Sequence, residues 1–241
     1  MMRPDIPCIT SFQQGEALRA LQDEAEKISA PLYEFGKNWL VRKGDDNFTF
    51  TDHNGDIVLP LPSLIGDHQI INAGNAIAAC TLLDGLDISG ENIAAGLKNA
   101  KWPGRLEQIT TGRLASDLPG GWELWFDGGH NEAGGYAMAQ MTEYWNDKPL
   151  YVICGTTRGK DVAAFLAPLK GKVTEVCGVR VRSEYDSYNG KEITDMASKA
   201  GLKSKAFSDV DDAIEYIIAK EDIPARILVF GSLFFMVELT H

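Results

Sequence analysis

Strand-like and helix-like segments alternate along the chain from residue 102 to its C-terminus. Apolar, β-prone residues predict strands at Arg105–Leu114, Trp122–Phe126, Leu150–Cys154, Val173–Val179, Ser204–Phe207 and Arg226–Phe230. Apolar positions at helical spacing predict helices at Glu132–Trp145, Val162–Leu169, Lys191–Ala200 and Val210–Lys220, and an apolar segment, Leu233–Leu239, follows the last strand. Strands that alternate with helices of about 10 to 15 residues predict a mostly parallel sheet covered by helices on both faces.

The first hundred residues have a different pattern. It predicts a helix at Gln14–Ser29, β-prone segments at Leu32–Phe35, Trp39–Arg42, Phe48–Asp52 and Ile57–Leu59, and helices at Ile70–Leu83 and Ser89–Asn99. Asn54-Gly55 predicts a tight hairpin turn, because both residue types accept positive φ values. The change of pattern near Lys101 predicts two domains, an α/β unit over residues 1–101 and a Rossmann-like α/β domain over residues 102–241.

The composition of the 241-residue chain is ordinary for a globular protein, with 44% hydrophobic and 24% charged residues. The net charge of −11 argues against nonspecific binding to nucleic acid or to an anionic membrane, because both need clustered lysine and arginine. The longest apolar run, Ile227–Val237, is shorter than the roughly 20 residues that span a bilayer, so we expect a cytoplasmic protein. The four cysteines lack C-x-x-C spacing, which predicts buried free thiols rather than a zinc site or disulfides.

Two polar, glycine-containing segments adjoin predicted strands, at residues 102–107 and 126–131. Arg105 in the first is a fixed cation suited to a phosphate, and an ion pair with Glu107 or Glu123 is the alternative. The second places Asp127, His130 and Asn131 at a strand-to-helix turn, where backbone N–H groups can bind an anion. The alternative there is a helix N-cap by Asn131 and a His130 side chain satisfied within the core.

Three further segments carry polar side chains at the ends of predicted elements. Residues 66–79 place Asn72 near the start of an alanine-rich helix, where its amide could pair with an adenine edge or only help to cap the helix. Residues 154–161 form a strand-to-helix loop that contains Lys160 and Asp161, and Asp161 could be no more than its cap. Residues 230–235 place Ser232 after the last predicted strand, at the strand end where open α/β sheets bind ligands.

These five segments resemble, in the same order, segments of folylpolyglutamate synthase, a member of the Mur ligase superfamily. Residues 103–107 read Pro-Gly-Arg-Leu-Glu, as in the family, and residues 68–73 match its His-Gln-x-x-Asn-Ala. Residues 127–132 read Asp-Gly-Gly-His-Asn-Glu in place of Asp-Gly-Ala-His-Asn-Pro, and 231–235 read Gly-Ser-Leu-Phe-Phe in place of Gly-Ser-Leu-Tyr-Leu. In the fourth segment Lys160 and Asp161 are retained, whereas Gly159 replaces the first aspartate of Asp-Lys-Asp.

The resemblance implies a role for each matched residue. Asn72 would meet adenine, Arg105 the ATP phosphates and Asp127 the ribose hydroxyls. His130 would lie near the nucleotide phosphates and the incoming glutamate, so Arg105 and His130 are the implied catalytic residues. Lys160 and Ser232 would bind the glutamate substrate.

The resemblance also implies an ATP- and Mg²⁺-dependent ligase that adds L-glutamate to folates, and to dihydropteroate, through an acyl phosphate. A monomer without nucleic-acid or membrane partners is expected. The sequence has no P-loop, so we expect an inactive fragment in which residues 1–101 are the last part of an ATPase domain and most metal ligands lie elsewhere. Residues 102–241 would be the glutamate ligase domain.

Two other functions remain open from the sequence. One is a muramyl-peptide ligase, which adds an amino acid to a cell-wall precursor by the same ATP-dependent chemistry. The other is a nonenzymatic nucleotide-binding module, which the lack of a P-loop would suit. A NAD-dependent dehydrogenase is disfavoured, because no G-x-G-x-x-G follows a predicted strand.

Overall fold

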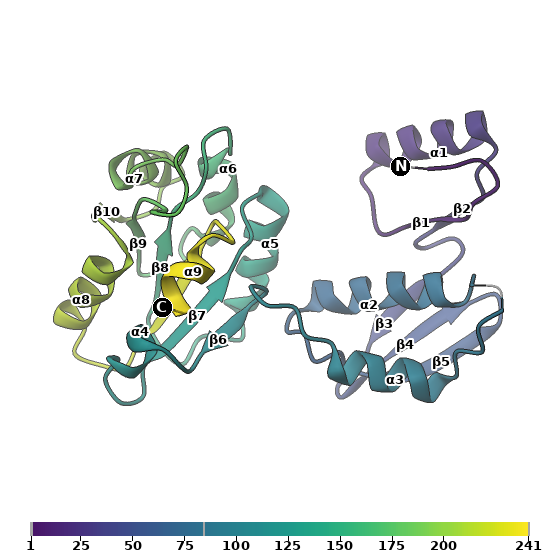
Figure 1. Cartoon of the computed structure of the whole chain (residues 1–241), viewed down its shortest axis with the longest axis horizontal. Coiled ribbons are helices and arrows are strands. Elements are labelled where there is room, and N and C mark those ends of the chain that lie inside the picture. The colour runs from purple at the N-terminus through teal and green to yellow at the C-terminus, as the bar shows by residue number, and fades with distance from the viewer. Residues whose placement is uncertain (1, 84, 241) are drawn as a thin grey trace. The chain divides into compact units, whose positions relative to one another are not determined.

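The structure is a computed structural model and describes residues 2–83 and 85–240. The chain divides into two compact units, Met1–Lys101 and Trp102–His241, which are described separately (Figure 1). The identity of the first unit as part of an ATPase domain stays a prediction.

The described residues of the first unit form two small sheets and three helices. Strands β1 (Cys8–Thr10) and β2 (Leu32–Glu34) pair in parallel on either side of helix α1 (Gly15–Ile28) in the sequence. Strands β3 (Leu40–Lys43), β4 (Asn47–Asp52) and β5 (Gly55–Pro60) form an antiparallel sheet, followed by helices α2 (Asp67–Cys80) and α3 (Gly90–Asn99). Their shared core includes the buried aromatic residues Trp39, Phe48 and Phe50.

The predicted hairpin forms, but its turn differs from the expected one. Asp52 already pairs with Gly55, so His53 and Asn54 are the connecting residues. Gly55 has a φ of 113°, whereas Asn54 is not among the residues with positive φ. The Asp52 side chain accepts hydrogen bonds from the backbone and side-chain nitrogens of Asn54, at 2.8 and 3.2 Å, and this local pairing holds Asn54 without a left-handed backbone.

The second unit is built around a six-stranded sheet with the order β10-β9-β8-β11-β7-β6. Its strands are β6 (Glu107–Ile109), β7 (Glu123–Asp127), β8 (Leu150–Cys154), β9 (Glu175–Gly178), β10 (Ser204–Ala206) and β11 (Arg226–Phe230). All neighbouring pairs are parallel except β6 with β7. Every residue of β8, β9 and β11 is buried, which explains why β8 is a continuous apolar run in the sequence and why β11 is one after its first residue, Arg226.

Helices cover both faces of this sheet (Figure 1). Helices α5 (Glu132–Met141), α6 (Val162–Leu166) and α7 (Gly190–Lys199) contribute to one core cluster, together with side chains such as Val152 and Leu228 of the sheet. Helices α4 (Arg113–Ser116), α8 (Val210–Lys220) and α9 (Phe235–Thr240) contribute to the other, with Ile153 and Val229. The predicted class, a mostly parallel sheet between two helical layers, is confirmed.

Several predicted boundaries are wrong, and the local sequence and backbone give the reason for two of them. The expected strand Arg105–Leu114 shrinks to β6, because Leu106 has a φ of 41° and Gly112 a φ of 88°, both incompatible with an extended strand. The expected helix Val162–Leu169 ends as α6 and continues as a short 3₁₀ helix, Ala167–Leu169, which contains Pro168. The helix expected to reach Trp145 ends at Met141.

Candidate functional site

The strand register of the second unit brings four chain segments to one edge of the sheet. Phe230 at the end of β11 lies opposite Asp127 of β7 on one side and Cys154 of β8 on the other. Cys154 in turn lies opposite Gly178, the last residue of β9. The segments that follow these strands, at 128–131, 155–161, 179–189 and 231–234, therefore begin at the same edge. This edge is formed by the carboxyl ends of the parallel strands, where open α/β sheets bind ligands.

The segment Gly104–Glu107 is hydrogen-bonded to the turn after β7. Asp127 accepts from the backbone nitrogens of Leu106 and Gly129, at 2.9 and 2.6 Å, through its two carboxylate oxygens. The Gly128 nitrogen donates to the Gly104 carbonyl oxygen at 2.9 Å. Two segments that the sequence singles out separately are thus joined by the Asp127 carboxylate and by the Gly128 backbone.

Arg105 is half-buried in this structure and has no ion-pair partner among the described residues. Its Nη1 donates to the Gly104 carbonyl oxygen at 3.4 Å, and a Cβ built on Gly128 would lie 3.2 Å from that nitrogen. The alternative ion pairs of Arg105 do not form, because Glu107 accepts from the Gly104 nitrogen and Glu123 binds Arg226. The guanidinium keeps its capacity to bind an anion.

In the Asp-Gly-Gly-His-Asn turn, Asn131 has a structural role, whereas the His130 side chain lies partly exposed. The Asn131 side chain caps helix α5 by accepting from the Gly134 nitrogen at 2.9 Å, which was the structural alternative for this residue. His130 is half-buried rather than part of the core, and its Nδ1 lies 3.1 Å from the Gly128 carbonyl oxygen. If Nδ1 carries the proton that this contact uses, Nε2 is left as an acceptor.

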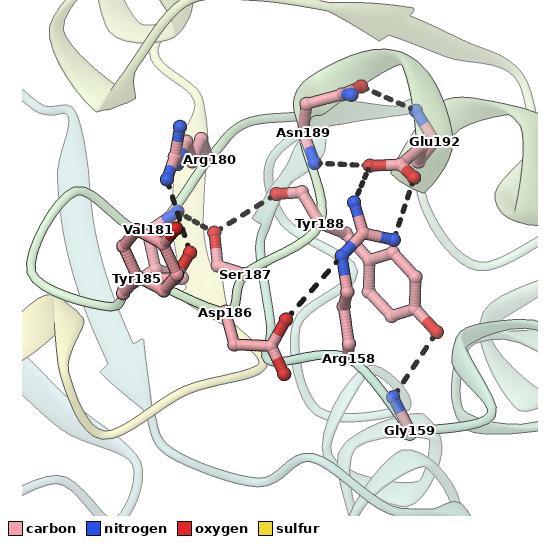
Figure 2. Close-up of polar contacts among 10 residues, drawn as sticks. All are labelled: Arg158, Gly159, Arg180, Val181, Tyr185, Asp186, Ser187, Tyr188, Asn189 and Glu192. Carbon is pink, nitrogen blue, oxygen red and sulfur yellow. Dashed lines mark hydrogen bonds and ion pairs between the residues drawn. The ribbon is translucent and has the colours of Figure 1, made fainter.

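Lys160 and Ser232 follow neighbouring strands of the sheet, β8 and β11. Lys160 is exposed and makes no ion pair within the described part of the chain, while Asp161 caps helix α6 by accepting from the Ala164 nitrogen at 3.0 Å. Ser232 is 5% exposed, and its Oγ accepts from the Phe234 nitrogen at 3.3 Å. Sequence reasoning gave no role to Arg158, which makes the densest polar contacts of the 155–161 loop (Figure 2).

Asn72 lies in the first unit, on helix α2, and is exposed. Its side-chain nitrogen donates to Gln69 at 3.0 Å, and the Gln69 amide in turn lies 3.0 Å from His68 Nε2. The N-cap of α2 is Gly66, which makes no side-chain capping bond, so none of these polar side chains serves as the N-cap. The Asn75 side-chain oxygen is buried without a partner among the described residues.

No group of three or more histidine, cysteine, aspartate and glutamate side chains that could hold a metal ion converges in the described ranges 2–83 and 85–240. None of the described helices is long and apolar enough to cross a membrane.

The chain is similar in sequence to known enzymes of folate metabolism, as two relatives illustrate. No family model matches the chain. The chain is 27% identical over 249 residues to the dihydrofolate synthase/folylpolyglutamate synthase of Bacillus subtilis, covering 99% of this chain and 55% of that protein. It is also 27% identical over 173 residues to the folylpolyglutamate synthase of Lacticaseibacillus casei, covering 68% of this chain and 38% of that protein.

Solved structures agree with these relatives. Escherichia coli FolC in complex with DHPP and ADP superposes with a TM-score of 0.80 at 23% identity, covering 99% of this chain and 54% of that one. Thermotoga maritima folylpolyglutamate synthase superposes with a TM-score of 0.70 at 28% identity, covering 97% of this chain and 53% of that one. The resemblance predicted from five segments is confirmed in sequence and in fold, and the chain spans about half the length of the relatives it matches.

Proposed function

We propose that this chain, a homologue of the folylpolyglutamate and dihydrofolate synthases, acts in an ATP-dependent ligase that joins L-glutamate to a folate or to dihydropteroate. The observation that supports this most is the position of Arg105. Its guanidinium lies beside Gly128 with no carboxylate partner among the described residues, at the edge of the sheet that also carries Asp127, His130, Lys160 and Ser232.

In the proposed reaction the γ-phosphoryl group of ATP passes to the carboxylate of the folate, giving an acyl phosphate and ADP. The amine of glutamate then attacks the acyl carbon, and the tetrahedral intermediate collapses with loss of inorganic phosphate. Negative charge develops on phosphoryl and acyl oxygens in both steps. A fixed cation such as Arg105 stabilises that charge.

Arg105, Asp127 and His130 of the second unit are the proposed nucleotide ligands, and the contact of Asn72 with adenine is a separate prediction for the first unit. The Asp127 carboxylate oxygens accept from the backbone nitrogens of Leu106 and Gly129, which fixes the direction of the side chain, and a carboxylate is a suitable acceptor for ribose hydroxyls. The Asn72 side-chain nitrogen is held by Gln69, which leaves its amide oxygen as the acceptor for an adenine amino group.

The glutamate is assigned to Lys160 and Ser232. Lys160 offers an exposed ammonium for a carboxylate, and Ser232 a hydroxyl whose proton is not used in its bond from the Phe234 nitrogen. ATP and Mg²⁺ are the proposed cofactors; the metal would neutralise phosphate charge. A monomeric state stays a prediction.

The test is the addition of radiolabelled L-glutamate to dihydropteroate and to tetrahydrofolate in the presence of ATP and Mg²⁺. It is run on this chain alone and on the chain joined to the preceding ATPase region of the Bacillus subtilis relative. We expect ligation in the joined protein, and loss of at least about 100-fold in kcat/KM on Arg105→Ala. Arg113→Ala, which removes an exposed arginine of helix α4, is the matched control.

Other outcomes would support other functions. Transfer of an amino acid to a UDP-linked muramyl acceptor, without transfer to either pteroate, would favour the cell-wall ligase. Binding of ADP without ligation by the joined protein would favour a nucleotide-binding module. The relatives reported above are named for the folate reaction, which favours the first proposal.

A further inference from the structure

Arg158 connects the loop after strand β8 to the start of helix α7. Its Nη1 and Nη2 donate to the two carboxylate oxygens of Glu192, both at 2.9 Å, so the pair is bidentate (Figure 2). Its Nε lies 3.6 Å from Asp186, and its Cζ lies 5.0 Å from the centre of the Tyr188 ring. One side chain thus contacts three residues of the segment that precedes or begins α7.

The backbones of the two segments are also joined. The Arg158 nitrogen donates to the Asp186 carbonyl oxygen at 2.9 Å, and the Tyr188 nitrogen donates to the Thr156 carbonyl oxygen at 3.0 Å. Thr157 and Ser187 form an isolated antiparallel bridge. The contact between residues 156–159 and 186–189 therefore has the character of a short strand pair that the Arg158 side chain completes.

The carboxylate that Arg158 binds is itself anchored. Glu192 and Asn189 form a reciprocal capping box: Glu192 accepts from the Asn189 nitrogen at 2.8 Å, and Asn189 accepts from the Glu192 nitrogen at 3.0 Å. The helix start is packed against the sheet, because a Cβ at Gly190 would lie 2.4 Å from the Gly178 carbonyl oxygen and 2.6 Å from that of Phe207. The Arg158 hydrogen bond, followed by that from Asn189, lowers the pKa of Glu192, which keeps its carboxylate ionised.

The loop is thus fixed on both sides of Lys160. Arg158 holds it on the N-terminal side, and the Asp161 cap of helix α6 holds it on the C-terminal side. The Lys160 side chain between them is exposed and has no ion-pair partner among the described residues. An exposed ion pair has little effect in most proteins, but a bidentate pair with an anchored carboxylate fixes a direction as well as a distance.

We propose that Arg158 is a positioning residue: by binding Glu192 it holds the 155–160 loop in the conformation that presents the Lys160 ammonium to a carboxylate of L-glutamate. The inference rests on the proposed function for the identity of the ligand. Arg158 does not touch the substrate and acts through Lys160.

Binding of L-glutamate to the 241-residue chain tests this directly and needs no ligation. Chemical-shift titration of the ¹⁵N-labelled chain gives the dissociation constant, and Arg158→Lys is expected to raise it about tenfold, because lysine keeps the charge but loses the bidentate fork. Lys160→Gln should raise it by a similar factor. The double variant should be within about twofold of Lys160→Gln alone, because an effect that acts through Lys160 vanishes when that ammonium is gone. Arg113→Lys is the control for the loss of an exposed arginine.

The proposal would be overturned if the wild-type chain does not bind glutamate, or if Arg158→Lys leaves the dissociation constant unchanged. It would also be overturned if Arg158→Lys has the same effect in the wild type and in Lys160→Gln, because the substitution would then act on the fold and not through Lys160. Circular dichroism and the thermal midpoint verify that each variant is folded. Glutamate binding that depends on Arg158 and Lys160, together with absence of ligation by the joined protein, would count against the proposed function and not against this inference.

Discussion

At the scale of single residues, the cluster of Arg158 and Glu192 has a counterpart at the amino-terminal ends of the strands, away from the candidate site at their carboxyl ends. Arg226 and Glu123 begin strands β11 and β7 and lie opposite each other in the register. Arg226 donates to Glu123 at 2.7 Å and to Asp147 at 3.1 Å, and Glu123 also accepts from Lys148 and from the Trp125 indole. The charged groups of this cluster form ion pairs with one another, and we infer that their role is structural.

Glu123 makes the folding of the chain dependent on pH. Burial alone would raise the pKa of Glu123, but hydrogen bonds from Arg226, Lys148 and Trp125 outweigh burial and hold the pKa at about 2, against an ordinary value of 4.5. The carboxylate therefore stabilises the folded state at pH values above about 4.5, and this contribution is lost as the pH falls from 4.5 towards 2. By pH 3 the loss amounts to about 2 kcal/mol of the free energy of unfolding.

Urea-induced unfolding of the wild type and of Glu123→Gln between pH 7 and pH 3 measures this contribution. The variant should be less stable at pH 7, because the buried Arg226 loses one of its two carboxylate partners within the described part of the chain and keeps Asp147. Its stability should fall less with acid, by about 2 kcal/mol, than that of the wild type. Parallel pH profiles for the two proteins would contradict the assignment.

The four free cysteines are predicted to differ in reactivity. Cys154 and Cys177 are buried, and burial raises the pKa of each thiol to about 12, whereas Cys8 and Cys80 are half-buried. Because the thiolate is the nucleophile, an aromatic disulfide reagent should label Cys8 and Cys80 in the native chain and the other two only after denaturation. Mass spectrometry of the labelled peptides identifies the sites, and early labelling of Cys154 would refute the prediction.

At the scale of elements, glycines mark where two segments come closest. A Cβ at Gly135 in helix α5 would lie 2.0 Å from the Phe165 carbonyl oxygen of helix α6, so this helix pair packs without room for a methyl group. In α3 of the first unit, Gly96 has no neighbour within 4 Å of such a Cβ. The same residue type is required by packing at one helical position and not at the other.

Alanine substitution at the two glycines should therefore have opposite effects. Gly135→Ala should destabilise the chain by about 2 kcal/mol, because backbone must move to admit the methyl group. Gly96→Ala should stabilise its helix by up to about 1 kcal/mol, because alanine loses less backbone entropy than glycine. Urea-induced unfolding followed by circular dichroism measures both, and destabilisation of equal size at the two positions would show that packing is not the cause.

Elements were predicted best from sequence where burial or capping is unambiguous. The bounds of Leu150–Cys154 and Arg226–Phe230 match β8 and β11 because every residue of these strands is buried, and Val210–Lys220 matches α8, which Asp209 caps. The strand expected to begin at Arg105 failed because a left-handed φ at Leu106, a non-glycine residue, leaves no trace in the pattern.

The candidate site was foreseeable in part. Asp127 and Ser232 come to one edge because parallel strands end together, which the alternation of strands and helices implies. The pairing of Arg158 with Glu192 joins residues 34 positions apart, and no local pattern in the sequence relates two surface charges over that separation. The roles of the matched residues stay predictions.

At the scale of the whole molecule, each unit has its own core. The two clusters of buried residues on either side of the six-stranded sheet draw all their members from residues 106–239, and the cluster around Phe48 and Phe50 draws its members from the first unit. Residues 102–241 therefore contain a complete core of their own.

We expect residues 102–241, produced alone, to fold. Near-ultraviolet circular dichroism should retain the signal of Trp122, Trp125 and Trp145, since the latter two rings pack 4.9 Å apart within this unit. Thermal unfolding should be cooperative, with a midpoint within about 5 °C of the second unit's transition in the full chain. A collapsed state without near-ultraviolet signal would show that the first unit is needed for packing.

The antiparallel direction of β6 determines how the two units are joined. Because β6 runs against β7, the chain enters the second unit at the ligand edge of the sheet, and Glu107 pairs with Phe126 near the end of β7. Gly104 is held there by hydrogen bonds with the Gly128 nitrogen and the Glu107 side chain, and the Arg105 nitrogen donates to the Trp102 carbonyl oxygen at 3.3 Å. Arg105 therefore belongs to the first hydrogen-bonded segment of the second unit, and the bonds that anchor the start of this unit also hold the backbone of the cation proposed to bind phosphate.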